Sequence, residues 1–290
     1  MPELPEVESV RRGLIAAQLR APVVSVWRSA SRLRIGQHWE DENLEVLSRA
    51  GGVTPGAVGR RGKYILWAFA GADGAELGLL IHLGMSGRCG VATQGQPRVA
   101  HTHFVLGFAD GRELRLVDPR RFGGLRAGTM AQLLAAPPIA DLGPEPLEPG
   151  FSGEVLERAL GASSRPIRDA LLDQSAVAGL GNIYAVESLF LAGIHPLLAA
   201  RRLHRSAWER LAGTIVAVLR QSIENGGTTL KDFRNVIGEV GRNQDDLKVY
   251  GRAGEPCPRC GRALEGFVSG GRSGAFCPKD QPRPRTKLLR

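Results

Sequence analysis

Between residues 4 and 19, apolar side chains recur every three or four positions, and charged side chains fill the positions between them. That period gathers the apolar residues on one face of a helix. Pro5 suits the first turn of a helix, where its missing N–H has no partner to lose. The pattern therefore predicts an amphipathic helix over residues 5–19.

From about residue 22 to residue 125 the pattern changes to short apolar and β-branched runs. Five segments have this character: PVVSVWR, KYILWAF, LGLLIHL, HFVLGF and ELRLV. Asp110-Gly111 lies between the last two, and this dipeptide favours a tight hairpin turn. The N-terminal half is therefore predicted to be a β-sandwich or barrel with one leading helix.

Five prolines interrupt residues 137–150, which we interpret as an interdomain linker. The chain beyond the linker has helical periodicity in four segments: EVLERALGA, IRDALLDQ, residues 183–192 and residues 207–225. Gly193 and Pro196 end the third of these segments.

The longest helical segment carries its own start and stop signals. Ser206 and Glu209 have the spacing of a capping box, and Gly226-Gly227 stop the helix. The polar stretch 238–248 is weakly patterned and is expected to be a mobile loop.

The chain has 290 residues, which is enough for two domains with a sizeable core. No apolar run approaches the length that spans a bilayer, so we expect no membrane association. The N-terminus, MPELPEVES, lacks the basic start and apolar middle of a secretory signal. A cytoplasmic protein is expected on these grounds.

The net charge of +9 indicates a polyanionic partner, although a solubilising surface would give the same total. Nine Lys or Arg and three Asp or Glu lie between Tyr250 and Arg290, so this segment carries +6. A folded basic module and a disordered tail both fit that charge, and the cysteines decide between them. Cys89 stands alone and is interpreted as a small buried apolar residue.

The other three cysteines form an incomplete pair of metal-binding knuckles. Cys257-Pro-Arg-Cys260 is followed, after sixteen residues, by Cys277-Pro-Lys-Asp280. Two CxxC knuckles at such a spacing would be a strong zinc signal, and a carboxylate can serve as the fourth ligand. We predict one structural zinc ion with Asp280 as a ligand. A site completed by water, or a degenerate finger without metal, stays open.

Few apolar residues lie between the two knuckles, so a metal would supply stability that the hairpin lacks. Arg272 lies in the turn region of this hairpin beside three glycines. An arginine on such a tip suits a phosphate, whereas by itself it would be interpreted as an ordinary solvated charge.

These features coincide with motifs that extend over nearly the whole chain. In order, they are MPELPEVE, GRRGKY, HLGMSG, DPRRFG, LLDQ, GLGNIYAVESLF, AGIHP, GGTTLKDF and YGRAGEPC, followed by the terminal finger. In this combination the chain resembles bacterial formamidopyrimidine-DNA glycosylase, a bifunctional glycosylase and abasic-site lyase. The departure is Asp280, where the family pattern has cysteine.

The resemblance implies an α+β multidomain fold in four segments. A β-sandwich catalytic domain with a leading helix would occupy residues 1–136, and the linker residues 137–150. A helix–two-turns–helix DNA-binding domain would span residues 151–249, and a zinc-finger β-hairpin residues 250–290. The implied partner is damaged double-stranded DNA, and the family expectation is a monomer.

The resemblance makes Pro2 a covalent nucleophile once Met1 is removed. A free α-amine has a reference pKa of about 7.7–8.0, so a usable fraction is neutral and can form an iminium with the sugar. The resemblance further implies Glu3 as general acid or base, Lys63 in the elimination steps and Arg272 as a catalytic phosphate contact. From local sequence alone, Pro2 would merely start a helix and Lys63 would be a surface lysine.

The remaining implied residues contact DNA. Met85, Arg120 and Phe122 would fill the gap left by an everted nucleotide, with Arg120 bonded to the estranged cytosine. The other implied contacts are with the DNA backbone or near the everted base: His82, His101, Arg165, Arg168, Asn182 and Tyr250. Without the resemblance, the histidines, Met85 and Phe122 would be interpreted as structural or core residues.

The expected activity is removal of oxidised purines, namely 8-oxoguanine and formamidopyrimidines, followed by β,δ-elimination. Two alternatives compete with it: a non-catalytic zinc protein that binds DNA, and an endonuclease VIII-type relative that prefers oxidised pyrimidines. Pro2, Glu3 and Lys63 argue against the first, and the set of Met85, Arg120 and Phe122 argues against the second.

Overall fold

The computed structural model describes residues 2–31, 33, 44–48, 52–71, 74–229, 233–236 and 238–283. The chain is divided into two compact units. The first combines Met1–Asp141 with Ile223–Gln244, and the second combines Leu142–Ser222 with Asp245–Arg290. The two units group residues that lie close in space, including residues far apart in the sequence. They therefore do not test the boundaries of the four predicted sequence segments, which stay predictions. Met1 and the last seven residues of the expected finger lie outside the described residues.

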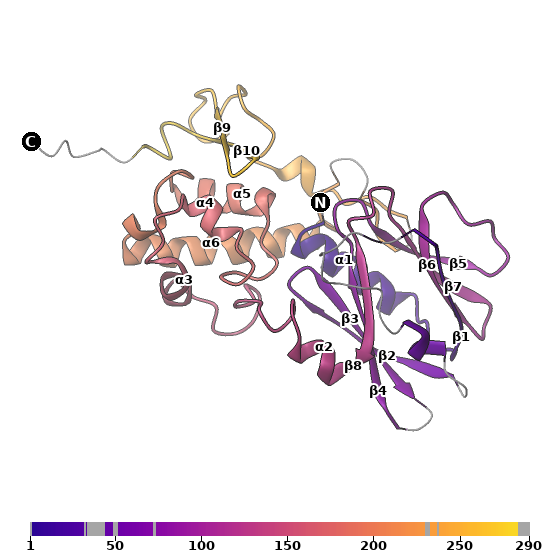
Figure 1. The fold of residues 1–290 in the computed structure, drawn as a ribbon. Coiled ribbons are helices and arrows are strands. Elements are labelled where there is room, and N and C mark those ends of the chain that lie inside the picture. Colours follow the sequence, from indigo (N-terminus) through magenta and orange to yellow (C-terminus); the bar gives the residue numbers. More distant parts are fainter. Residues whose placement is uncertain are drawn as a thin grey trace, which may run out of the picture. The chain divides into compact units, whose positions relative to one another are not determined.

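Within its described residues, the first unit contains a leading helix, the short helix η1, eight strands and the short helix α2 (Figure 1). Its elements are α1 (Leu4–Ala16), β1 (Val23–Arg28), η1 (Leu44–Ser48), β2 (Val53–Arg61), β3 (Tyr64–Gly71), β4 (Glu76–His82), β5 (Arg88–Thr93), β6 (Thr102–Phe108), β7 (Arg112–Val117), β8 (Gly124–Thr129) and α2 (Met130–Ala135).

The eight strands are hydrogen-bonded in the order β5-β7-β6-β1-β2-β3-β4-β8, and all pairs are antiparallel. β1 and β2 share only the pair Val23↔Val53. The sheet therefore turns a corner there and separates into two four-stranded halves. Buried side chains from both halves and from α1 form one core cluster. The predicted sandwich with a leading helix is confirmed.

Helix α1 begins one residue earlier than predicted and ends at Ala16, three residues sooner. Glu3 is its N-cap residue, and Glu6 completes a capping box. At the other end, Gln18 has a left-handed backbone (φ 48°), which a helix cannot continue. Arg112 donates to the carbonyls of Ala17 and Gln18 at 2.6 and 2.9 Å. A distant strand thus caps the helix, which local periodicity could not reveal.

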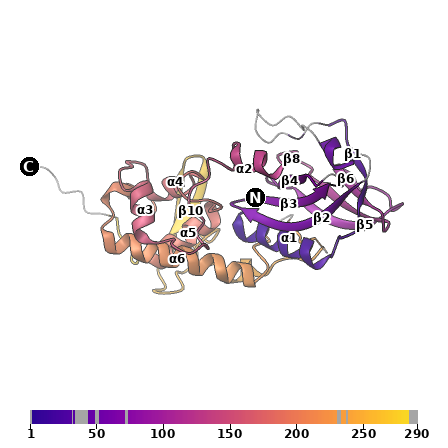
Figure 2. The ribbon, with the colours of Figure 1, turned by 90° about the horizontal axis from the view of Figure 1, so that it is seen from below.

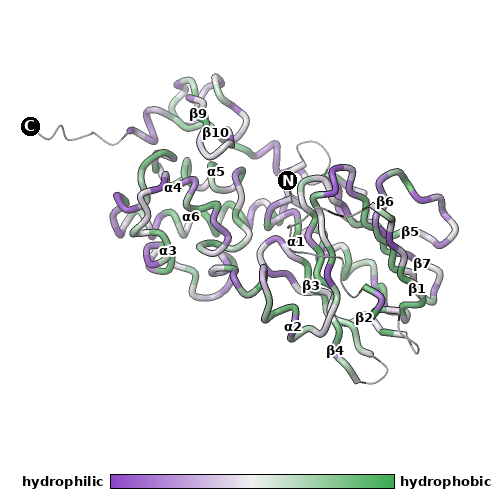
Figure 3. The backbone as a smooth tube through the Cα atoms, viewed as in Figure 1, coloured by the Kyte–Doolittle hydropathy of each residue, from purple (hydrophilic) through white to green (hydrophobic). Residues whose placement is uncertain are grey.

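The predicted hairpin at Asp110-Gly111 is confirmed. It joins β6 to β7, and Gly111 has a positive φ of 79°. Asp110 accepts from the Arg112 backbone N–H at 3.1 Å, which closes the turn. Figure 3 shows hydrophobic residues along the neighbouring strands β3 and β4 of the same unit.

The second unit is helical and ends in a two-stranded hairpin (Figures 1 and 2). Its elements are α3 (Gly153–Leu160), α4 (Ile167–Leu171), α5 (Asn182–Ala192), η2 (Ala200–Arg202), most of α6 (Arg205–Glu224), the end of η3 (Asn243–Asp246), β9 (Glu265–Ser269) and β10 (Arg272–Phe276). Gly193 ends α5 in the left-handed conformation, as predicted.

The predicted capping box of Ser206 and Glu209 is wrong. Helix α6 begins at Arg205, so Ser206 lies inside its first turn. The Glu209 carboxylate instead accepts from Gly153 N at 3.2 Å, at the start of α3. The polar stretch 238–248, expected to be a loop, contains the short helix η3.

A small apolar cluster supports the C-terminal hairpin. It joins buried residues of α5 to residues of β9, β10 and the cysteine knuckles: Val186, Phe190, Val249, Cys257, Leu264, Phe267, Ala275, Phe276 and Cys277. The hairpin therefore packs on α5 and does not fold around its own side chains alone. Cys89, in contrast, is buried in the first unit, as predicted.

Candidate active-site residues and nucleic-acid interface

The first residues of the chain are buried and tied down. Pro2 and Glu3 both lie in the interior, with Glu3 2 % exposed. Glu6 Oε2 accepts from Glu3 N at 2.8 Å, and Glu6 Oε1 accepts from Thr228 N at 2.7 Å. One carboxylate therefore fixes the N-terminus against a segment more than 200 positions further along the chain. Local sequence gives no sign of this distant partner of Glu6.

In the partner segment, Gly226–Thr229, Gly227 lies too close to Glu6 for a side chain to fit easily. Gly227 has a φ of 87°, and a Cβ there would lie 3.0 Å from Glu6 Oε1. Asn243 donates from Nδ2 to Thr228 Oγ1 at 2.8 Å and from its backbone N to Gly227 O at 3.2 Å. The glycine pair thus allows the close approach that places Thr228 on Glu6.

Lys63 lies in the two-residue turn between β2 and β3, after Gly62, whose φ is 55°. Although it is in a turn, Lys63 is only 8 % exposed. Arg60 Nη1 donates to Gly62 O at 3.0 Å, and Arg60 Nε lies 3.3 Å from Glu8 Oε2 on α1. The Lys63 turn is therefore linked to the helix that follows Pro2 and Glu3.

Glu8 makes this link through ion pairs with three arginines. It contacts Arg11 at 2.8 Å and Arg12 at 3.0 Å, in addition to Arg60. Burial raises the pKa of Glu8, but the hydrogen bonds from Arg11 and Arg12 outweigh burial and lower the pKa below its usual value. The carboxylate is thus charged at neutral pH.

His82 lies beside the Lys63 turn, opposite Tyr64 in the β3–β4 register. The two rings are 4.6 Å apart, and Gly84 N donates to His82 Nδ1 at 3.1 Å. Burial, followed by the charge of Lys63, lowers the His82 pKa to about 3. Because His82 is then neutral at physiological pH, its expected contact with DNA would be a hydrogen bond and not an ion pair.

The loops that carry Met85 and Phe122 touch each other. A Cβ on Gly84 would lie 2.2 Å from the Phe122 carbonyl carbon. Met85 is 40 % exposed, and the Arg120 guanidinium lies 4.9 Å from the centre of the Phe122 ring. The structure therefore brings these three predicted residues together on adjacent loops.

Asp118 fastens the two loops. It is fully buried, and Oδ1 accepts from Ser86 Oγ at 2.5 Å while Oδ2 accepts from Gly123 N at 2.7 Å. Ser86 Oγ in turn accepts from Arg120 N at 3.1 Å. Local sequence patterns gave no sign that Asp118 and Ser86 act as supporting residues. Both lie inside quoted motifs, but only the fold shows that they meet.

His101 and His103 support the same loop in different ways. His101 is exposed, has a left-handed φ of 65°, and accepts from Asp118 N through its carbonyl at 2.9 Å. His103 is buried, with Nε2 3.1 Å from Asp118 O and Nδ1 2.8 Å from Ser29 Oγ. His103 was not singled out from the sequence.

In the second unit, Arg168 and Asn182 bind the tip of the β9–β10 hairpin. Arg168 is fully buried, and its Nη2 donates to Ser269 O at 2.6 Å and to Arg272 O at 3.3 Å. Asn182 Nδ2 donates to Ser273 O at 2.9 Å. The side chain of Arg272 itself is exposed. Thus Arg272 is presented to solvent, while Arg168 holds its backbone.

Arg165 and Tyr250 are held by acidic side chains of the same unit. Arg165 is exposed and lies 3.2 Å from Asp173 Oδ2. Glu187, on α5, accepts from the backbone N–H groups of Lys248, Val249 and Tyr250 at 2.7–2.9 Å. Local sequence gave no sign of this role of Glu187, because the N–H groups that it binds lie far along the chain from α5.

The three predicted thiols and Asp280 converge. Their ligand atoms all lie within 4.8 Å of one another. Cys260 Sγ is 3.4 Å from Cys277 Sγ, and Cys257 Sγ is 3.4 Å from Asp280 Oδ2. Two sulfurs on one tetrahedral zinc ion, with Zn–S near 2.3 Å, lie about 3.8 Å apart. The donor set fits one zinc ion, which would cross-link the two knuckles.

Known proteins match this chain over almost its entire length. The formamidopyrimidine-DNA glycosylase of Shouchella clausii is 40 % identical over 288 residues, which cover 98 % of this chain and all of that protein. The protein of the same name from Teredinibacter turnerae is 44 % identical, covering 96 % and 98 %. The chain belongs to the formamidopyrimidine-DNA glycosylase family.

Three family models match successive segments of this glycosylase. The formamidopyrimidine-DNA glycosylase N-terminal domain matches residues 1–125, and the H2TH domain of the same family matches residues 142–234. The zinc finger found in FPG and IleRS matches residues 254–283. The predicted zinc-finger hairpin is therefore confirmed, and zinc is the cofactor.

Solved structures of relatives have the same fold. A Lactococcus lactis FPG variant in complex with Fapy-dG-containing DNA has a TM-score of 0.86 at 34 % identity, covering 97 % of this chain and all of that one. The MutM (FPG) protein of Thermus thermophilus has a TM-score of 0.84 at 38 % identity, covering 98 % and 100 %. A further Lactococcus lactis structure contains abasic-site DNA.

Together these findings identify a DNA glycosylase that acts in DNA repair and has DNA as its partner. Among the described helices, none combines the length and apolar character that crossing a bilayer requires.

Proposed function

We propose that this glycosylase removes oxidised purines, 8-oxoguanine and formamidopyrimidines, from duplex DNA and then cleaves the strand at the abasic site. The observation that carries the proposal is the fixed N-terminus: Pro2 is buried, and the Glu6 carboxylate bonds to the next residue, Glu3. The relatives bound to Fapy-dG and abasic-site DNA support the same substrate class.

Pro2 acts as the nucleophile after Met1 is removed. Its neutral nitrogen forms a bond to the sugar C1′ as the C1′–base bond breaks, and the departing base takes up a proton. Loss of the nitrogen's own proton and opening of the C1′–O4′ bond then give an iminium, as in other amine nucleophiles. Glu3 delivers the proton that O4′ needs when the ring opens.

The iminium then withdraws electrons from the sugar. Loss of a C2′ proton expels the 3′ phosphate, and a second elimination expels the 5′ phosphate. Lys63 holds the lesion's phosphate and transfers protons in these steps, and Arg272 neutralises a phosphate from the finger tip. The burial of Lys63 in a tight turn and the exposure of Arg272 at a fixed tip support these roles.

Met85 and Phe122 wedge into the space of the everted nucleotide, and Arg120 bonds to the cytosine left behind. Their adjacent loops and the Arg120–Phe122 contact support this assignment. The backbone contacts remain predictions for His82, His101, Arg165, Arg168, Asn182 and Tyr250. Since Arg168 is fully buried, any effect it has on DNA would pass through the hairpin tip that it binds.

Zinc is held by Cys257, Cys260, Cys277 and Asp280 in this proposal. The convergence of all four ligand atoms supports Asp280 as the fourth ligand. Bound zinc fixes the two knuckles and therefore the base of the hairpin that carries Arg272. We further propose that the enzyme is a monomer that works on DNA in the cytoplasm.

Borohydride trapping tests the proposed nucleophile. The Pro2→Gly variant should form far less trapped protein–DNA adduct and cleave abasic sites more slowly, because the secondary amine is gone. Its affinity for a duplex with an uncleavable abasic analogue should change little, since Pro2 makes no phosphate contact in the proposal. Loss of affinity and trapping together, in folded protein, would contradict this division of roles.

Two controls sharpen the experiment. The mass of the purified protein must show removal of Met1, because a retained methionine turns the Pro2 nitrogen into an amide; full activity of such protein would overturn the mechanism. Lys63→Met should slow strand cleavage, whereas Lys248→Met, at an exposed lysine, should not.

Faster excision of thymine glycol than of 8-oxoguanine opposite cytosine would refute the purine assignment.

A further inference from the structure

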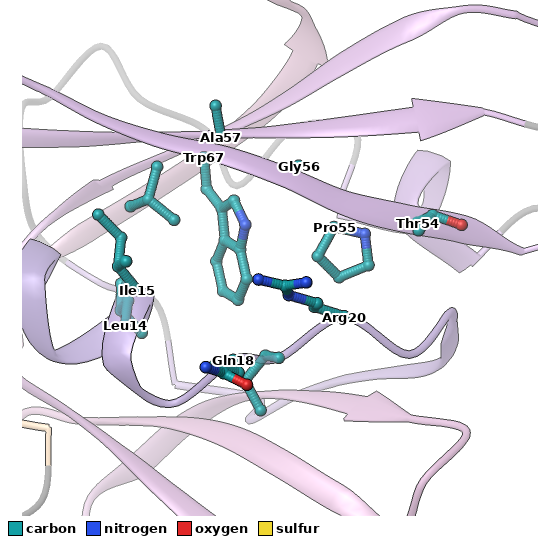
Figure 4. Close-up of a pocket in the computed structure, with 11 residues that line it drawn as sticks. Leu14, Ile15, Gln18, Arg20, Thr54, Pro55, Gly56, Ala57 and Trp67 are labelled. Atoms are coloured by element: carbon teal, nitrogen blue, oxygen red, sulfur yellow. The ribbon is translucent and has the colours of Figure 1, made fainter.

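A cavity of about 630 Å³ opens at the C-terminal end of α1, between that helix and β2 (Figure 4). We call it the α1–β2 pocket, and its described lining residues are Leu14, Ile15, Gln18, Leu19, Arg20, Thr54, Pro55, Gly56, Ala57, Val58 and Trp67. Its volume lies within the range of small-molecule sites, and its walls are largely apolar, as such sites usually are.

One residue that lines the pocket has a buried donor without an acceptor. Trp67 is 1 % exposed, and its Nε1 has no hydrogen-bond partner within the described part of the chain. Phe69 and Phe108 pack against the indole with ring centres 5.1 and 6.2 Å away, which keeps the ring in place. A buried N–H without an acceptor is unfavourable, and an oxygen of a bound ligand would satisfy it.

The pocket also contains one cation without a counter-ion. Arg20 is exposed and forms no ion pair among the described residues, and none of the described lining residues is acidic. Arg20 and Trp67 both line the pocket (Figure 4). Because Arg20 forms no ion pair among the described residues, its guanidinium is available to an anionic group of a ligand.

From these features we infer that the α1–β2 pocket binds a small amphipathic monocarboxylate. The apolar body of the ligand lies against Leu14, Ile15 and Pro55, and its carboxylate pairs with Arg20. One carboxylate oxygen accepts from Trp67 Nε1–H. The apolar walls, the orphan donor and the unpaired cation each match one part of such a molecule.

This site is separate from the proposed nucleophile. Pro2 precedes the N-terminus of α1, whereas the pocket lies at its C-terminus. A helix of 13 residues is about 20 Å long. Occupation of the pocket therefore does not require any of the groups assigned to DNA chemistry.

Nuclear magnetic resonance of the indole N–H groups tests the inference, with octanoate as the probe. The chain has four tryptophans, so four indole signals are expected, and Trp67→Phe identifies one of them. Octanoate, kept below its micelle concentration, should shift the Trp67 proton downfield in a saturable way, because the N–H gains an acceptor. Octan-1-ol has the same chain length without the charge and should bind much more weakly.

Arg20→Gln should weaken octanoate binding by about tenfold or more, since the ion pair is lost. Arg201→Gln, at an exposed arginine in η2, should leave binding unchanged. Calorimetric titration of the wild type, Arg20→Gln and Arg201→Gln decides the matter even if Trp67→Phe fails to fold. The inference is overturned if octanoate gives no saturable binding, or if octan-1-ol binds equally well and Arg20→Gln has no effect.

Discussion

Single buried carboxylates position the groups that we assign to DNA. Asp118 accepts from Ser86 and Gly123, and so joins the loops of Met85 and Phe122. Glu6 accepts from Glu3 N and Thr228 N, and Glu187 accepts from three successive backbone N–H groups. Ionised acceptors make stronger hydrogen bonds than neutral ones. Each of these residues therefore fixes a segment without touching DNA in the proposal.

Asp118→Asn tests this at one position. Asparagine offers one acceptor oxygen where the carboxylate has two, so one of its two bonds is lost and the other is weakened. We expect the free energy of unfolding to fall by about 1–3 kcal/mol. We also expect slower excision of a damaged base opposite cytosine, because the two loops are no longer held together by Asp118. Chemical denaturation and excision assays measure these effects. Asp110→Asn, in an exposed turn, is the matched control and should have a smaller effect on both; equal effects would refute the clamp.

At the level of elements, the β9–β10 hairpin depends on side chains from the helices. Arg168 and Asn182 bind three carbonyls of its tip, and Ser269 Oγ donates to Asp169 Oδ2 at 2.5 Å. The hairpin has only five paired positions of its own. Two-stranded hairpins of this size are marginal by themselves, so these contacts and the metal site hold it in place.

A double-mutant cycle tests whether Arg168 acts through Arg272. Arg272→Ala should weaken binding to an abasic-analogue duplex, and Arg168→Met should weaken it to a similar degree, because the tip loses its anchor. The double variant should then be no weaker than Arg272→Ala alone. Fluorescence anisotropy gives the affinities. Additive effects would show that Arg168 contributes independently of the tip.

Arg168→Lys retains the charge and one donor, so it should recover part of the affinity if Arg168→Met is too unstable to study. Arg158→Met, at an exposed arginine of α3, controls for loss of a positive charge in the same unit. It should change affinity little.

The metal site makes a second prediction for this hairpin. Asp280→Ala should lower the zinc content of the purified protein and speed zinc loss to a chelator, because one of four ligands is gone. Asp280→Cys should slow that loss, since it completes a four-thiolate site. Elemental analysis and chelator kinetics report this directly. Equal zinc retention in Asp280→Ala and the wild type would exclude Asp280 as a ligand.

At the scale of the whole molecule, a net charge of +9 favours a polyanionic partner, and the number of phosphates that its cations neutralise sets how binding responds to salt. The proposed grip on the phosphates uses two exposed or rim cations, Lys63 and Arg272, while Arg168 and Asn182 position the tip, so affinity should fall with a log–log slope of about −2 or steeper. Measuring binding to an abasic-analogue duplex over a range of salt concentrations gives the slope. A slope near zero would contradict a phosphate-dominated interface.

The sequence by itself indicated most of the elements and the family, and it is the source of the chemistry that we propose. Periodicity indicated the leading helix and the strands, because burial on one face leaves a regular pattern. The spacing of Cys257, Cys260, Cys277 and Asp280 indicated the finger, since local knuckles fix ligand positions. Motifs also indicated Met85, Arg120 and Phe122, but not that Asp118 would join their loops.

Only the tertiary structure decided which distant residues meet. Arg112 ends α1, Glu209 reaches Gly153 instead of capping its own helix, and Arg168 is buried under the hairpin tip. The orphan N–H of Trp67 is likewise invisible in the sequence. Such contacts depend on how strands and helices far apart in the chain are brought together, and local patterns carry no information about the partner of a buried polar group.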